Sequence, residues 1–141
     1  MVVEPILRLS SDSRTTAGIL LLTIVAVEYG GWFMLRVVRG GRPATSLQQA
    51  FFRAGHAHAG VLVILALVGQ LFADATTMSG LHALLARNGI WLAAILMPAG
   101  YFLSVARRGA TEPNRLLWLV YLGALSLGVG VVSLGIGLLT T

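Results

Sequence analysis

The sequence predicts an all-α integral membrane protein, a single domain over residues 1–141 folded as an up-and-down four-helix bundle. Hydrophobic residues make up 57% of the 141 residues, charged residues only 11%, and the mean hydropathy is +0.86. A soluble domain of this length needs far less apolar surface for its core. The apolar residues gather in four stretches, each near the ~20 residues that a helix needs to cross ~30 Å of hydrocarbon. Short connections join the stretches, so successive helices must run in opposite directions.

The four helices are expected at about 16–38, 46–74, 80–106 and 113–139. The first helix is followed by Gly40, Gly41 and Pro43, which favour its end because none of them continues a helix well. Ser46 and Gln49, three residues apart, match the capping box that begins a helix. We therefore predict Ser46 as the cap of the second helix.

The third and fourth helices carry weaker boundary signals. Ser79 can cap the third helix, and Thr111 with Pro113 fits the beginning of the fourth. Pro98 lies inside the third helix and frees a backbone carbonyl one turn earlier, so a kink is expected between Ala94 and Pro98.

All ten basic residues are arginines, and their positions predict the orientation in the membrane. Six lie on one side of the predicted bundle. Arg36, Arg39 and Arg42 are at the connection between the first and second helices, and Arg107, Arg108 and Arg115 are at the connection between the third and fourth. The other side carries arginines that acidic residues offset: Arg8, Arg14 and Arg87 with Glu4, Asp12 and Asp74. The positive-inside rule then places both termini on the outer side of the cell's inner (plasma) membrane. Arginines beside apolar spans contact lipid headgroups, so the net charge of +5 indicates the bilayer as partner and not a nucleic acid.

Two further patterns bear on chemistry and assembly. The absence of cysteine excludes disulfides, thiolate metal sites and iron–sulfur clusters. The fourth helix has small residues at four-residue spacing, Ser126 with Gly130 and Ser133 with Gly137, which let another helix approach closely. Four short helices enclose little volume, so we expect a homo-oligomer that forms through such small-residue faces.

Ionisable residues at the beginning of the second helix are the best clue to function, because such groups are costly in a membrane. Arg53, His56 and His58 lie there among small residues, including Gly55 and Gly60. The histidines are two positions apart, ~200° around a helix, so they cannot share one metal ion. Small neighbours would let a flat macrocycle lie against the helix while an imidazole reaches iron, which predicts a haem ligand. The alternative is that the small residues serve helix packing and each histidine forms a hydrogen bond across an interface.

Other polar residues are predicted in the same half of the membrane. Counted along antiparallel helices, Glu28 has nearly the depth of His58, so the two can meet. Unpaired, Glu28 would be neutral and able to shuttle a proton, whereas pairing with a histidine or Arg53 is the structural alternative. Arg53 could bind a haem propionate, anchor at headgroups or form a salt bridge. Tyr101, three residues after Pro98, is a candidate catalytic phenol.

The opposite half of the membrane is expected to be comparatively bland. Its polar residues lie toward its edge: Gln70, Arg87 and Asn88.

Arg53-Ala54-Gly55-His56-Ala57-His58-Ala59-Gly60, followed by an apolar helix and later by Gly-Tyr-Phe-Leu-Ser at 100–104, resembles the small four-helix membrane proteins of the styrene oxide isomerase and hydroxylaminobenzene mutase type. In the isomerase branch an Arg-Ala-His-x-Gly run opens the second helix, its histidine ligates haem b, and a tyrosine of the third helix belongs to the pocket. Matching His-x-Gly places the ligand on His58, with His56 as the alternative. The isomerases carry an asparagine shortly afterwards, whereas residues 61–65 here are wholly apolar.

The resemblance implies an oligomer with haem near subunit contacts, and ferric iron acting as a Lewis acid on an epoxide oxygen. The reaction would be rearrangement of a small apolar aromatic substrate to an aldehyde without net redox change, with Tyr101 orienting the substrate. Two alternatives stay open: a haem-carrying electron-transfer or accessory subunit, and a small transporter or assembly factor in which Glu28, His56 and His58 form a proton-coupled or structural network.

Overall fold

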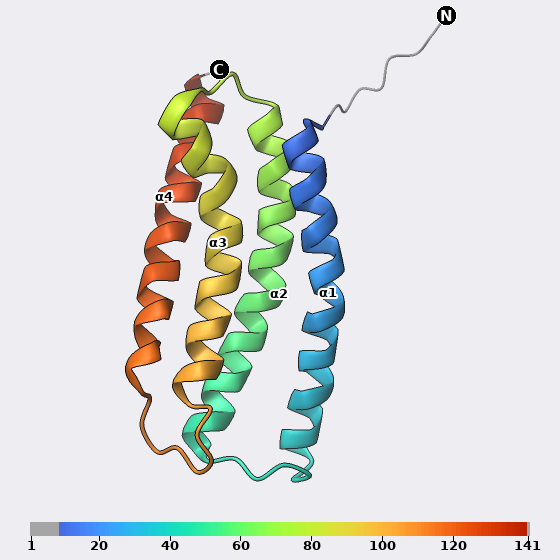
Figure 1. Cartoon of the computed structure of the whole chain (residues 1–141), viewed down its shortest axis with the longest axis vertical. Coiled ribbons are helices and arrows are strands. Elements are labelled where there is room, and N and C mark those ends of the chain that lie inside the picture. Colours follow the sequence, from blue (N-terminus) through green and yellow to red (C-terminus); the bar gives the residue numbers. More distant parts are fainter. Residues whose placement is uncertain (1–8, 141) are drawn as a thin grey trace, which may run out of the picture.

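A computed structural model describes residues 9–140 of the chain, and these residues form an all-helical structure without strands (Figure 1). Its four long helices are α1 (Ser11–Val38), α2 (Ser46–Asp74), α3 (Gly80–Ser104) and α4 (Trp118–Thr140), with a short 3-10 helix at Arg115–Leu117. The helices alternate in direction, so α1 begins and α4 ends at the same end of the molecule (Figure 1). We call this end, with loop 75–79, the terminal end; the opposite end, with loops 39–45 and 105–114, is the arginine-rich end. The predicted all-α, up-and-down four-helix fold is confirmed.

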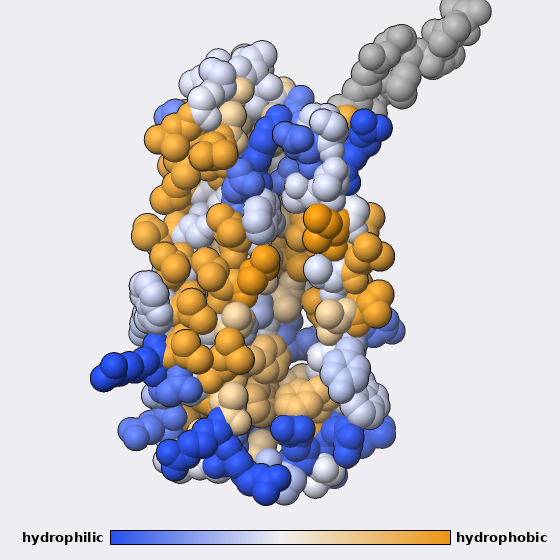
Figure 2. Space-filling model, in the orientation of Figure 1, coloured by the Kyte–Doolittle hydropathy of each residue, from blue (hydrophilic) through white to orange (hydrophobic). Residues whose placement is uncertain are grey.

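All four helices are long and apolar enough to cross a membrane, as expected of a multi-pass membrane protein. Apolar side chains cover the middle of the molecule, whereas hydrophilic side chains gather toward the two ends (Figure 2). This banding is what a hydrocarbon layer with two polar surfaces requires. Glu4 and Arg8, which entered the orientation argument, lie outside the described residues.

The observed helix boundaries correct two predicted caps. Thr45, and not Ser46, caps α2: its side chain accepts a hydrogen bond from the Gln48 backbone N–H, and the Gln48 side chain accepts one from the Thr45 N–H. The capping box is therefore present one residue earlier than predicted. Thr45 also donates its hydroxyl proton to the Ala110 carbonyl, a bond across the arginine-rich end that the local sequence pattern does not indicate.

The fourth helical segment begins at Arg115, where Asn114 caps the 3-10 turn; Thr111 and Pro113 do not begin it. Ser79 precedes α3 as expected but makes no capping hydrogen bond through its side chain. Gly40 adopts φ +74° after α1, a left-handed conformation that glycine reaches without steric cost. Pro98 lies within α3, and the helix continues past it to Ser104.

Helices α3 and α4 are the most closely packed pair. A Cβ atom on Gly89 would lie 2.6 Å from the Gly130 Cα, and the Ser126 hydroxyl donates to the Gly89 carbonyl over 2.8 Å. Gly123 likewise accommodates Met97 of α3. The small residues predicted to receive a neighbouring subunit at Ser126 and Gly130 are thus occupied by α3 of the same chain.

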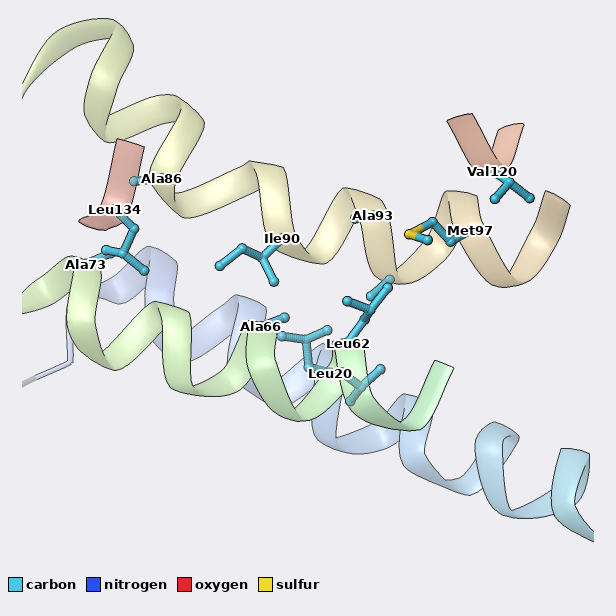
Figure 3. Close-up of a cluster of buried hydrophobic side chains, with 12 residues drawn as sticks. Leu20, Leu62, Ala66, Ala73, Ala86, Ile90, Ala93, Met97, Val120 and Leu134 are labelled. Atoms are coloured by element: carbon cyan, nitrogen blue, oxygen red, sulfur yellow. The ribbon is translucent and has the colours of Figure 1, made fainter. Parts of the chain in front are cut away.

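Two clusters of buried hydrophobic side chains hold the helices together. The larger runs along α2 and α3 with contributions from α1 and α4, and it includes Leu20, Leu62, Ala66, Ile90 and Leu134 (Figure 3). The smaller lies at the arginine-rich end, where Met34 and Val37 of α1 pack with Phe52, Val105 and Ala110. Within the described residues, α1 makes close backbone contacts with α2 and none with α3 or α4. This leaves a gap over α2, between α1 and α3, that side chains only partly fill.

Candidate functional site

An apolar groove of about 330 Å³ lies over α2, between α1 and α3. Its lining comes from three helices: Thr16, Ile19, Leu20, Thr23, Ala26, Val27 and Gly30; His56, Ala59 and Val63; and Trp91, Ala94, Ile95 and Phe102. Along α1 the lining extends from Thr16 to Gly30, about 21 Å at 1.5 Å per residue. Among these lining residues, His56 carries the only ionisable side chain.

His56 lies at the end of the groove nearer the arginine-rich end, and its ring faces α1. A Cβ atom on Gly30 would be 3.3 Å from its Nδ1, and one on Gly31 would be 3.6 Å from its Nε2. The glycine pair therefore makes room for the imidazole edge. His56 has no hydrogen-bond partner among residues 9–140, whereas Thr23 and Trp91 already donate to Leu20 and Asn88. An imidazole left without a partner in hydrocarbon costs free energy that a polar ligand atom would recover.

His58 faces α3, on a different side of α2 from His56. Its Nδ1 lies 2.7 Å from the Ala54 carbonyl oxygen, and its ring centroid lies 5.0 Å from that of Tyr101. The carbonyl can only accept, so Nδ1 must carry a proton, and in the neutral ring Nε2 then holds the lone pair. The structure thus brings together the predicted residues His58 and Tyr101, with Phe51 also packed edge-on against the tyrosine.

Glu28 and Arg53 are not part of either histidine's surroundings. Both side chains are exposed, and within the described part of the chain neither forms a hydrogen bond or ion pair. Gly30 and Gly31 of α1 lie opposite His56 of α2. Because the two helices are antiparallel, Glu28, two residues before Gly30, lies near the depth of His58, two residues after His56. Equal depth does not bring them together, because Glu28 lies on another face of α1. The pairing of Glu28 with a histidine or Arg53, which was the structural alternative, does not occur among the described residues of the single chain.

The two candidate glycines of the second helix have different surroundings. A Cβ on Gly55 would lie 2.9 Å from the Phe102 ring and 3.0 Å from the Tyr101 Cβ. This glycine therefore lets α3 approach α2 within the same chain, which leaves no space there for a macrocycle. Gly60 is more open, with the Val27 side chain 4.0 Å from such an atom.

Sequence reasoning missed a buried polar network at the terminal end. Arg87 of α3 donates to Asp74 of α2 over 2.6 Å and to the Ser13 hydroxyl of α1 over 2.9 Å. Ser13 in turn donates to Gln70, whose amide donates to the Arg87 carbonyl. The Ser10 backbone N–H donates to the second oxygen of Asp74. Ser13 is 0% exposed and Gln70 is 4% exposed. Gln70 and Arg87 lie toward the edge of this half, as expected, but the sequence did not indicate that Ser13 and Asp74 join them in one buried network.

The described residues do not form a metal site from several side chains. They contain no group of three or more His, Asp or Glu side chains placed to hold a metal ion. Single-imidazole ligation, as in haem proteins, remains compatible with this finding because the macrocycle supplies four nitrogens itself.

No family model, no curated protein and no solved structure matches the chain.

Proposed function

We propose that this protein is a membrane isomerase or mutase that takes a small apolar molecule from the lipid into the groove between α1, α2 and α3. The observation that carries the proposal is the groove itself, about 330 Å³ of apolar space with the unpartnered imidazole of His56 on its wall. Binding sites for small molecules have this size and this composition, mostly apolar with few polar groups. A ligand can lie along α1 with its polar atom at His56.

His56 is the residue we assign to the chemistry in the groove. An imidazole can donate a proton to a ligand oxygen or nitrogen and take one back near neutral pH. In an epoxide-to-aldehyde rearrangement His56 would donate a proton to the oxygen as one C–O bond breaks, a hydride would shift from the oxygen-bearing carbon to its neighbour, and the imidazole would take the proton back as the C=O bond forms. No electron acceptor is needed. The apolar walls exclude water, which favours rearrangement over hydrolysis of a reactive intermediate.

The groove can be tested through Trp91, which lines it. In a variant that keeps Trp91 as the only tryptophan, bromobenzene should quench the fluorescence along a saturable curve. Ala59→Phe fills the groove and should abolish saturation. Ala57→Phe adds the same bulk at an exposed position of α2 and should leave the curve unchanged. Linear quenching in the parent protein would contradict a binding site.

Activity is tested separately with styrene oxide as the probe, followed by NMR in detergent. We expect conversion to the aldehyde, reduced at least tenfold in His56→Leu and unchanged in His82→Leu, a histidine outside the groove. Full activity of His56→Leu would remove the assigned role, and an inert parent protein would remove the isomerase proposal for this substrate class.

Haem b is the cofactor that the resemblance to the styrene oxide isomerase type implies, and we propose His58 as its ligand. What supports His58 is the bond from Nδ1 to Ala54, which leaves an Nε2 lone pair of the kind that binds iron. His56 stays the alternative ligand, with its nitrogen edge beside Gly30 and Gly31 of α1. When bound, ferric haem supplies a Lewis acid that polarises an epoxide oxygen. Tyr101 packs against the His58 ring, with the centroids 5.0 Å apart, so haem on His58 would require the tyrosine to move aside, and its role in orienting a substrate is what the resemblance implies. Arg53 and Glu28 remain candidates only at a contact with another subunit.

A second function has one specific observation in its favour. His58 and the groove lie on different sides of α2, so haem on His58 would not face a molecule bound beside His56. This separation favours a haem-carrying accessory or electron-transfer subunit. Ferrous protein that fails to bind carbon monoxide would support this alternative, whereas carbon monoxide binding would support an open catalytic position.

The absorption spectrum of detergent-purified protein tests haem directly. We expect a Soret band that disappears in His58→Ala and persists in His56→Ala. A colourless protein, after haem is supplied during expression, would end both haem-dependent proposals and leave the groove proposal standing.

We further propose that the arginine-rich end faces the cytoplasm of a bacterial-type plasma membrane and both termini face outward. The chain has no cysteine, so single cysteines report topology cleanly. Ser11→Cys should react with an impermeant maleimide on intact cells, and Thr111→Cys only after lysis. The reverse pattern would invert the topology. A homo-oligomer is also proposed; Gly128 and Gly135 of α4, which face open space in the single chain, support it.

A further inference from the structure

A second pocket, of about 560 Å³, lies at the arginine-rich end and has a chemistry opposite to that of the groove. Three arginines from three separate segments line it: Arg36 from α1, Arg42 from loop 39–45 and Arg108 from loop 105–114. Its other lining residues include Tyr29, Trp32 and Gln48, and no carboxylate lines it. Within residues 9–140, none of the three arginines forms an ion pair. Three positive charges thus converge without an anionic partner from the chain.

The pocket is held in place by the surrounding structure. Gln48, which is 5% exposed, donates from its side-chain amide to the carbonyls of Val105 and Arg107, each over 3.0 Å. These bonds fix the backbone next to Arg108 against α2. The guanidinium of Arg36 lies 5.1 Å from the ring centroid of Trp32. The guanidinium of Arg42 lies 5.0 Å from the ring centroid of Phe33. Stacking on aromatic rings limits where these two side chains can point.

We propose that this pocket binds a phosphate group, held by Arg36, Arg42 and Arg108. Guanidinium groups bind phosphate oxygens through paired, charge-assisted hydrogen bonds, and three of them can neutralise the charge of one phosphate. The acidic residues of this half, Glu28 and Glu112, do not line the pocket.

The position favours a phospholipid headgroup as the source of the phosphate. Tyr29 and Trp32 are 67% and 50% exposed beside the pocket, at the end of the apolar band. Aromatic side chains of this kind gather at the level of the headgroups in membrane proteins. A lipid could thus place its phosphate among the arginines while its chains stay in the hydrocarbon. A soluble phosphate compound has the same headgroup chemistry, and the experiment distinguishes the two sources.

Native mass spectrometry of the full-length protein in detergent, with added phosphatidylglycerol or with inorganic phosphate, tests this site. The pocket variant is Arg36→Gln/Arg42→Gln/Arg108→Gln. Its matched control, Arg39→Gln/Arg107→Gln/Arg115→Gln, removes the same charge from the same end outside the pocket. We expect phosphatidylglycerol binding to weaken by about tenfold or more in the pocket variant, since charge-assisted hydrogen bonds are lost. The control should stay within about twofold of the parent protein, because its arginines do not line the pocket and more distant charges are screened.

Each outcome decides the proposal. Saturable binding of inorganic phosphate that depends on the pocket arginines, without lipid binding, would support the phosphate site and identify a soluble source. Equal weakening in both triple variants would indicate a diffuse charge effect and overturn the proposal. If the triple variant fails to fold, Arg42→Gln alone can be compared with Arg39→Gln, because both positions are exposed and only Arg42 lines the pocket.

Discussion

Helix α1 and the α3–α4 pair are attached to the molecule in different ways. In α3–α4 the two backbones touch: Gly89 lies against Gly130, and Ser126 bonds across to the Gly89 carbonyl. Helix α1 contacts α2 alone through its backbone and leaves most of its apolar surface exposed. It is held at the arginine-rich end by the smaller hydrophobic cluster, and at the terminal end by the Arg87 network.

This difference shows where the chain can accommodate a ligand. Close backbone packing between α3 and α4 leaves no volume for a guest. Between its two attached ends, α1 forms one wall of the groove, with His56 over Gly30 and Gly31. The site therefore lies along the less firmly held helix, where local stability is lower.

The largest effect is expected from bulk between α3 and α4. Gly130→Leu should cost about 3 kcal/mol or more, because even its Cβ would lie 2.9 Å from the Gly89 Cα and the helices must separate. Gly18→Leu is the matched control, since nothing lies within 4 Å of a Cβ at this exposed position of α1. Unfolding in mixed detergent, followed by circular dichroism, measures both variants. Equal stability of the two would refute the packing difference between α1 and α3–α4.

A smaller effect is expected where α1 is held at the terminal end. Arg87→Ala should cost about 1–2 kcal/mol, because Asp74, with a side chain only 8% exposed, loses its charged partner. Hydrogen exchange should accelerate in the first turns of α1 while α3–α4 stays protected. Arg14→Ala, at an exposed position of the same helix, should change neither. Acceleration spread evenly over all helices would show that the network does not act on α1 specifically.

The smallest effect is expected at the arginine-rich end. Thr45→Ala should cost about 1 kcal/mol, the usual contribution of a helix N-cap. It also removes the bond to the Ala110 carbonyl, so loop 105–114 should become more accessible to protease. Ser46→Ala should stay within about 0.5 kcal/mol of the parent protein, as an exposed position without such bonds does. A larger loss from Ser46→Ala would restore the cap predicted from the sequence.

The candidate site could be predicted from the sequence only in part. The sequence indicated that His56 and His58 occupy different faces, because two residues turn a helix by ~200°. It could not indicate that Gly30 and Gly31 receive one ring and Tyr101 the other. Glu28 illustrates the limit: residue counting gave its depth correctly, but the rotation of α1 about its own axis turns it away from both histidines. That rotation depends on contacts such as Phe33 with Phe52, far apart in sequence.

The sequence by itself determined the four membrane-crossing helices and their alternating directions, since the hydrocarbon thickness requires about twenty apolar residues of each span regardless of its neighbours. The tertiary structure decided which face each helix turns toward another. It placed the small residues of α4 against α3, joined Ser13, Gln70, Asp74 and Arg87 into one network, and opened the groove beside α1. These features depend on helix order, rotation and close packing, which arise from contacts between distant segments and leave no local pattern along the chain.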